Sequence, residues 1–232
     1  MTISWYGEAC FLLESGGVRV LIEPPQKESG INSPRLKSDI LIYSKPRNSE
    51  GSSLNGSETE TFIIDSPGEY EIKGINVLGI ADDHSTGSLP GPEGPSGPRT
   101  AGQANTIYNI EIDGIKISHL GFLGKDLDDG KMALINDPDI VLVPVGNGAV
   151  LDAEKAMKLI NKIEPSVAIP MLYDISAKGG SASGGKGPKI KRAPLSVFLK
   201  ESEAKESSQP KLTIKKKDLI EEETKIVILE KV

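Results

Sequence analysis

The sequence predicts an α/β or α+β layered domain whose core lies between β-sheets. Two observations favour this class: short apolar runs separated by turn residues fill the first half, and strand-like and helix-like segments alternate in the second. The chain has 232 residues, 37% of them hydrophobic, and a chain of this length can bury a full core without disulfides. We expect one domain spanning residues 1–232, with flexible insertions at 88–102 and 177–187.

Turn residues divide the first half of the chain into strands. Gly16 and Gly17 separate two apolar runs, and Asp113-Gly114 separates two more, which is a strong hairpin signal. The expected strands are Ile3–Tyr6, Cys10–Leu13, Val18–Glu23, Asp39–Ser44, Thr61–Ile64, Tyr70–Ile72, Ile75–Ile80, Thr106–Ile112 and Ile115–Leu120. Strands of this density imply sheets that pack face to face.

The second half begins with a β-branched run that predicts a strand at Ile140–Val145. Apolar residues then recur at helical spacing, which predicts an amphipathic helix over Val150–Ile163, with Asp152 as its N-cap. The remaining expected elements are a strand at Val167–Leu172, a helix at Leu195–Glu201, and a closing pair of strands at Leu212–Lys215 and Lys225–Leu229. Both insertions are rich in Gly, Pro and small polar residues, a composition that does not pack a core.

Composition excludes several functional classes. The net charge is −6, so the chain is not a strongly basic nucleic-acid binder, and we consider nucleic acid an improbable partner. No apolar run reaches the roughly 18 residues of a membrane span, and no secretory signal is visible, so we expect a cytoplasmic protein without a membrane partner. One cysteine and two histidines exclude a cysteine cluster and any site that needs three imidazoles.

Eight short motifs resemble the metallo-β-lactamase superfamily, in the family's order and over nearly the whole chain. They are W-Y-G-E-A-C-F at 5–11, V-L-I-E-P at 20–24, P-R-L-K-S-D-I-L-I-Y-S at 34–44, P-G-E-Y-E-I-K-G-I at 67–75, N-T-I-Y at 105–108, H-L-G-F-L-G at 119–124, V-P-V-G at 143–146 and I-E-P-S-V-A-I-P-M-L-Y at 163–173. The closest branch is that of bacterial zinc-dependent hydrolases. The resemblance implies a four-layer αβ/βα sandwich, with two mixed sheets and helices outside.

The resemblance also implies where metal ligands would lie. In the family, a strand ends in S-H-x-H-x-D-H, and further ligands come from a His before N-T-I-Y, the Asp of H-L-G-D and the His of P-M-H-Y. In this sequence the corresponding positions, with their neighbours, are Glu8, Lys45, Arg47, Ser49, Glu50, Asp82, His84, His119, Phe122 and Leu172. We expect these residues to line one pocket, with no catalytic residue among them.

The substitutions at these positions predict that the metal site is lost. A divalent ion about 4 Å from a lysine ammonium would meet a repulsion of roughly 8 kcal/mol at an effective dielectric near 20, and Arg47 cannot deprotonate to become a ligand. We therefore expect no cofactor, and a non-catalytic pseudoenzyme that binds an unknown protein or a small anionic ligand. For the latter, Lys45 and Arg47 would receive a phosphate or carboxylate.

One alternative stays open from the residues. Carboxylates could form an oxygen-rich metal site in an active hydrolase of phosphodiester or ester bonds. Its ligands would come from Glu8, Glu50, Asp82, His84 and His119. For His119 the simpler interpretation is a packed, hydrogen-bonded side chain, because no carboxylate follows it in the H-L-G-F motif.

Overall fold

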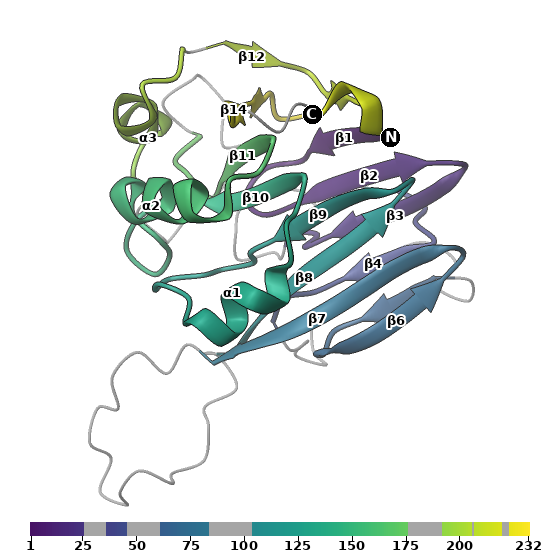
Figure 1. The fold of residues 1–232 in the computed structure, drawn as a ribbon. Helices are drawn as coiled ribbons and strands as arrows, with labels where there is room; N and C mark the ends of the chain where they lie inside the picture. Colours follow the sequence, from purple (N-terminus) through teal and green to yellow (C-terminus); the bar gives the residue numbers. More distant parts are fainter. Residues whose placement is uncertain (26–35, 46–60, 84–103, 176–191, 206, 220–222) are drawn as a thin grey trace, which may run out of the picture.

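The computed structural model describes residues 1–25, 36–45, 61–83, 104–175, 192–205, 207–219 and 223–232 (Figure 1). Within these residues, one sheet has six strands in the order β13-β1-β2-β3-β4-β5. Its strands are β1 (Thr2–Trp5), β2 (Phe11–Ser15), β3 (Val18–Ile22), β4 (Ile40–Ile42), β5 (Phe62–Ile64) and β13 (Leu212–Thr213). The first three form an antiparallel meander, whereas β3, β4 and β5 run parallel.

The described part of the second sheet has seven strands, in the order β14-β11-β10-β9-β8-β7-β6. Its strands are β6 (Gly68–Ile72), β7 (Ile75–Asp83), β8 (Ala104–Ile112), β9 (Ile115–His119), β10 (Ile140–Pro144), β11 (Val167–Met171) and β14 (Lys225–Ile226). From β6 to β9 the strands are antiparallel, and from β9 to β14 they are parallel. A short parallel pair, β12 (Ser208–Gln209) and β15 (Ile228–Leu229), stands apart from both sheets.

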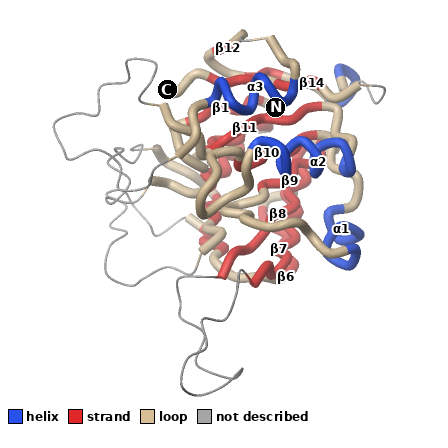
Figure 2. Tube along the Cα trace, turned by 90° about the vertical axis from the view of Figure 1, so that its left-hand side faces the viewer, coloured by secondary structure: helices blue, strands red, loops and turns tan. Residues whose placement is uncertain are grey.

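The main core lies between the two large sheets, which Figure 2 shows in a second view. Alternate residues of β3 and β4, such as Val20, Ile22 and Ile40, join one large buried cluster with residues of the seven-stranded sheet. The intervening residues, such as Leu21 and Leu41, belong to a smaller cluster on the other face. This two-residue period follows from the strand geometry, in which successive side chains point to opposite faces.

Three α-helices are described: α1 (Asp129–Ile135), α2 (Ala153–Ile163) and α3 (Leu195–Ser202), with a short 3₁₀ turn, η5 (Lys216–Asp218). In Figure 1, α1 and α2 lie over the seven-stranded sheet. The predicted N-cap of α2 is confirmed, because the Asp152 side chain accepts a hydrogen bond of 2.8 Å from Lys155 N. Asp152 has extended backbone angles, so the helix begins three residues later than expected. None of these described helices is long and apolar enough to cross a bilayer.

The fold class is confirmed by the two mixed sheets. The hairpin at Asp113-Gly114 is also confirmed, since both residues have the positive φ that a type I′ turn needs (53° and 69°). The predicted closing pair of strands is wrong: β13 pairs with β1, β14 with β11 and β15 with β12. These short segments complete three different sheets because the edges of those sheets supply free backbone groups. The two expected insertions lie outside the described residues, and the single-domain organisation stays a prediction.

Candidate functional site at the strand ends

Loops from both large sheets meet at one edge of the molecule. The loop after β4 is joined to β8 by a hydrogen bond of 2.8 Å from Thr106 N to Ser44 O. The loop between β1 and β2 is joined to the end of β11 by a bond of 3.3 Å from Leu172 N to Glu8 O. Because the carboxyl ends of parallel strands share an edge of the sheet, the loops after β9, β10 and β11 come to the same place.

Glu8 and Arg192 form an ion pair at this edge. The guanidinium of Arg192 donates from Nη2 to Glu8 Oε2, and the two side chains are 6% and 18% exposed. Glu8 adopts a left-handed conformation (φ 51°), and Trp5 Nε1 donates a bond of 3.0 Å to its carbonyl. The backbone next to Arg192 is also fixed, because Ala193 N donates a hydrogen bond of 2.7 Å to Gly146 O.

Lys45 is a second cation at this edge, and its ammonium faces an aromatic ring. Its Nζ lies 3.8 Å from the centroid of the Phe122 ring. Burial lowers the pKa of Lys45, Glu23 acts in the opposite direction, and the Arg192 guanidinium lowers the pKa further. We use the term strand-end cluster for Glu8, Lys45, Phe122, Leu172 and Arg192.

Glu23 directly follows β3, and its charge acts on Lys45. Its side chain is buried, and its Oε1 accepts a hydrogen bond from Ser44 N. Burial raises the pKa of Glu23 to about 7, against the opposing effects of Ser44 and of the charge on Lys45. Glu23 is therefore an ionisable group whose charge changes near neutral pH beside a half-buried cation.

Both ring nitrogens of His119 form hydrogen bonds with backbone groups. Nε2 lies 3.0 Å from Ala9 O, and Nδ1 accepts a bond of 3.1 Å from Gly121 N. A neutral ring with its proton on Nε2 satisfies both contacts. Burial lowers the pKa of His119 to about 4, so the ring is a neutral structural link between the β1–β2 loop and the loop after β9.

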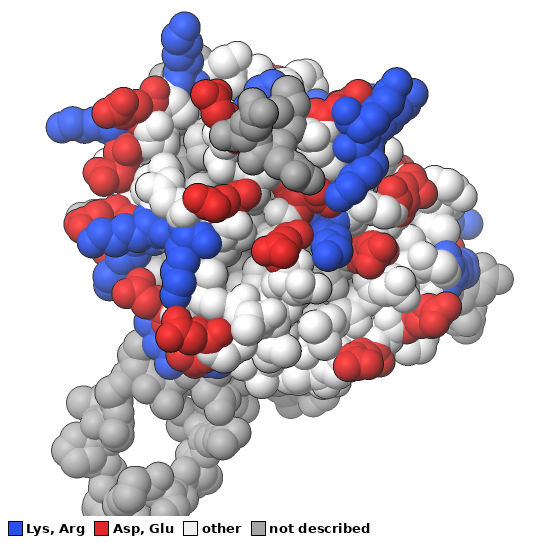
Figure 3. All heavy atoms as spheres, in the orientation of Figure 1, with Lys and Arg blue, Asp and Glu red and all other residues white. Residues whose placement is uncertain are grey.

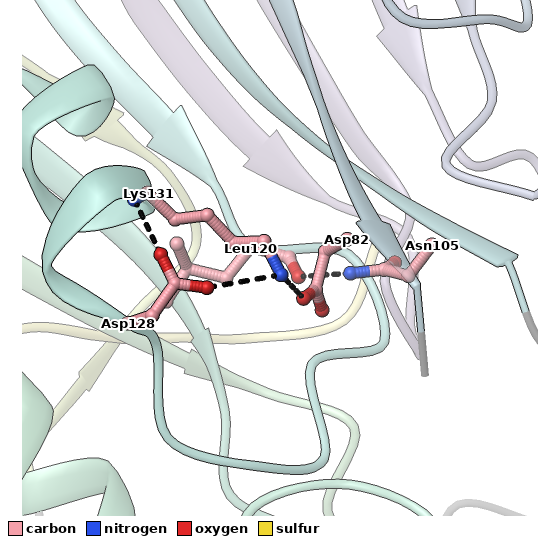
Figure 4. Close-up of polar contacts among 5 residues, drawn as sticks. All are labelled: Asp82, Asn105, Leu120, Asp128 and Lys131. Carbon is pink, nitrogen blue, oxygen red and sulfur yellow. Dashed lines mark hydrogen bonds and ion pairs between the residues drawn. The ribbon is translucent and has the colours of Figure 1, made fainter. Parts of the chain in front are cut away.

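Asp82 lies on the same edge, at the end of β7 (Figure 4). Its carboxylate is 1% exposed and accepts a bond of 2.8 Å from Lys131 Nζ of α1, which also lies 3.5 Å from Asp128. Asp82 pairs in register with Asn105 of β8. The Asn105 amide donates to Leu120 O (3.2 Å), and this side chain therefore connects Asp82 to the loop after β9.

The structure thus brings together some of the residues that the sequence selected. Lys45 contacts Phe122, and Leu172 contacts Glu8. His119 links the loops that carry Glu8 and Phe122. Asp82 is connected to Phe122 through Asn105, whose Oδ1 accepts a 2.8 Å bond from Phe122 N. Arg47, Ser49, Glu50 and His84 lie outside the described residues. Sequence reasoning missed Arg192, because no motif marks it; the only available signal was its place in the basic run K-I-K-R after a glycine-rich segment.

A cavity of about 460 Å³ lies elsewhere, over β6–β9 beside the end of α1. Its lining includes Glu69, Glu71, Glu111 and Lys116, and none of its lining residues belongs to the strand-end cluster. In the view of Figure 3, acidic and basic side chains are interspersed over the surface. Because the loops from both sheets converge elsewhere, we place the candidate site at the strand-end cluster and not at this cavity.

Comparison with known proteins decides the family. A family model described as the beta-lactamase superfamily domain matches residues 2–172, most of the chain. This chain belongs to the metallo-β-lactamase superfamily. A crystal structure from Thermotoga maritima, assigned to the zinc-dependent hydrolases of this superfamily, has a TM-score of 0.69 at 24% identity and covers 98% of this chain and 97% of that one. The isothiocyanate hydrolase from Delia radicum gut bacteria shares the metallo-β-lactamase fold, with a TM-score of 0.63 at 12% identity over 100% and 97% of the two chains.

Relatives in sequence are named metal-dependent hydrolases. One from Archaeoglobus fulgidus is 27% identical over 194 residues, covering 75% of this chain and 84% of that protein. Another from Methanoregula boonei is 27% identical over 217 residues, covering 86% and 94%. Metal-dependent hydrolase is therefore a recurring name among the sequence relatives of this chain.

These names contradict the expectation that the protein has no metal cofactor. That expectation treated the loss of imidazole ligands as the loss of the site, whereas carboxylate oxygens also bind divalent cations. Two of the candidate ligands, Glu50 and His84, lie outside the described residues. Within the described part of the chain, no three His, Cys, Asp or Glu side chains are grouped so that they could hold a metal ion. The described residues alone do not make up a metal site.

The comparisons also favour the alternative function over the first one. They describe hydrolases, and they give no support to a non-catalytic pseudoenzyme. Membership of the superfamily and the hydrolase-like fold are thus established for this chain.

Proposed function

We propose that this protein is a metal-dependent hydrolase that cleaves ester or phosphodiester bonds at the strand-end cluster. The observation that carries the proposal is the naming of relatives that match up to 86% of this chain as metal-dependent hydrolases. The position of the cluster agrees with it, because catalytic residues are often carried by loops that a rigid scaffold holds in place.

The chain's own residues at this position suit a substrate that becomes more negative during reaction. Lys45 is a half-buried cation, and the Arg192 side chain is almost fully buried. The two residues lie on loops that belong to different sheets. Cations held in a site of low dielectric stabilise the negative charge that develops on the attacked ester or phosphoryl group. Their environment is already organised, since Phe122 holds the lysine and Glu8 holds the arginine.

Asp82 is a buried carboxylate at this edge, and we assign it to the active site. Glu50 and His84 are the further candidates from the sequence. A metal ion bound here would supply an activated water and polarise the scissile bond. The described residues alone do not complete such a site.

The experiment is a hydrolysis assay with bis(4-nitrophenyl) phosphate and 4-nitrophenyl acetate, using full-length protein loaded with manganese or zinc. We expect turnover that EDTA abolishes and that the Asp82→Asn variant lowers by about a hundredfold. Asp128→Asn is the matched control, because Asp128 contacts the same Lys131 but is 65% exposed. Chelator-insensitive turnover, or equal activity in the Asp82 and control variants, would contradict the proposal.

A further inference from the structure

The two cations of the strand-end cluster have unequal partners. The Arg192 side chain is bonded to Glu8, whereas the described surroundings offer Lys45 the face of Phe122, 3.8 Å from its Nζ. The positive charge of Arg192 acts on Lys45 and lowers the pKa of its ammonium. The fold therefore holds two like charges near one another.

The acidic groups of the described surroundings balance these charges only in part. Glu8 pairs with Arg192. The acid that acts on Lys45 is Glu23, which is buried, and burial raises its pKa. Its carboxylate already accepts a hydrogen bond from Ser44 N, so it offsets the charge of Lys45 only in part. The described groups thus leave an excess of positive charge, centred on Lys45.

We infer that Lys45 and Arg192 form an anion-recognition subsite that takes the phosphodiester group of the substrate. The inference rests on the proposed function, since it names the substrate class of the same site. A phosphodiester carries a single negative charge, which matches the excess of positive charge better than a neutral ester does. Lysine supplies a point charge, and the guanidinium has N–H donors beyond the Nη2 group that bonds Glu8.

The position of the two side chains supports a shared ligand. Lys45 follows β4 of one sheet, and Gly146 follows β10 of the other. The Arg192 side chain packs against Gly146, because a Cβ added to this glycine would lie 3.3 Å from Arg192 Cδ. An oxyanion between them would be bound from both sheets at once. Charge-assisted hydrogen bonds of this kind are among the strongest that a protein makes to phosphate.

The test measures binding without turnover. Full-length protein without added metal is titrated with dimethyl phosphate in a calorimeter and in thermal melts, with neutral trimethyl phosphate as the matched ligand. We expect saturable binding of dimethyl phosphate only. Lys45→Gln should weaken it by about tenfold or more, the loss of one charge-assisted bond, whereas Lys45→Arg should keep most of it. Lys200→Gln, at an exposed residue of α3, is the control and should bind normally.

Three results would overturn the inference. These are equal binding of the two phosphates, equal affinity in Lys45→Gln and the unmodified protein, or tighter binding of acetate than of dimethyl phosphate.

The two proposals can fail separately. Lys45-dependent phosphate binding in a protein that hydrolyses nothing would support the subsite and contradict the hydrolase, while metal-dependent cleavage of 4-nitrophenyl acetate without phosphate binding would do the reverse.

Discussion

The Lys45 ammonium lies 3.8 Å from the centre of the Phe122 ring. These residues come from the loops after β4 and β9, which belong to different sheets. The contact is therefore one of the points at which the two sheets meet at the candidate site. A cation held by an aromatic face is attracted by the ring quadrupole.

Replacing Lys45 with methionine should change the stability of the fold very little. The variant loses the contact with Phe122 and the attraction to Glu23, but it also removes a desolvated charge near Arg192. Replacing a partly buried charge with an apolar side chain is often neutral, so we expect a change of less than about 1 kcal/mol in the free energy of unfolding. Urea denaturation measures it. A loss of about 3 kcal/mol or more would mean that Lys45 is a structural ion-pair partner and not a ligand-binding group.

Breaking the Glu8–Arg192 ion pair should destabilise the protein much more. Glu8→Gln or Arg192→Met alone leaves the other charge largely buried, which costs about 3 kcal/mol. The double variant should lose clearly less than the sum of the two, which a double-mutant cycle in urea would show. The exposed pair Glu154–Lys158 is the control, with an expected coupling of about 0.5 kcal/mol or less. Additive losses at Glu8 and Arg192 would contradict the ion pair.

His119 should make the protein less stable in mild acid. Its pKa is about 4 in the folded protein, against 6.5 as the ordinary value. The unfolded chain therefore takes up a proton first, so the free energy of unfolding should fall as the pH drops from about 6.5 to about 4, by about 3 kcal/mol in total. Denaturation at several pH values, with His119→Gln as the comparison, tests this. A His119 ring that titrates near its ordinary pKa in an NMR experiment would refute it.

Glu23 should act in the opposite direction. Its pKa is raised from 4.5 to about 7 in the fold, so the unfolded chain loses the proton first as the pH rises. This group should lower the free energy of unfolding between about pH 4.5 and 7, by about 3 kcal/mol. Glu23→Gln should thus raise the free energy of unfolding relative to the unmodified protein, and this gain should be larger at about pH 8 than at about pH 5. Equal gains at the two pH values would contradict the buried, raised-pKa carboxyl group.

Gly121 should not tolerate a side chain. It has a φ of 58°, and a Cβ there would lie 2.8 Å from Ser44 Oγ and would also collide with Asn105 Oδ1. Gly121→Ala should cost more than about 2 kcal/mol, because it adds a clash to the strain of the left-handed backbone. Gly114→Ala, at a φ of 69° with nothing within 4 Å of the new Cβ, measures the strain alone, at about 1 kcal/mol. Equal losses would show that the packing around Gly121 is not tight.

The sequence predicts the strands and the fold class well, because buried strands leave a strong apolar signal. The Asp152 cap of α2 and the Asp113-Gly114 hairpin follow from local chemistry that does not depend on the rest of the chain. Helix α1 was missed because it has seven residues and includes Gly130, too short for a helical period to be recognised. The partners of β13, β14 and β15 depend on which sheet edges are open, which local sequence does not record.

The candidate site could be predicted only in part. The resemblance selected positions that the structure joins, such as Lys45 and Phe122. Arg192 was not predictable, since it reaches Glu8 across 184 positions of the sequence and no motif marks it. The metal was wrongly excluded, because counting imidazoles ignores the carboxylates that serve the same purpose.

The most direct test of the account combines metal content and turnover in one preparation of the full-length protein. Metal bound per chain is measured by elemental analysis, and hydrolysis of bis(4-nitrophenyl) phosphate is followed before EDTA treatment, after it, and after manganese or zinc is restored. We predict that bound metal and turnover disappear together and return together. Protein that binds no metal under these conditions, or that loses its metal without any change in turnover, would contradict the proposed hydrolase.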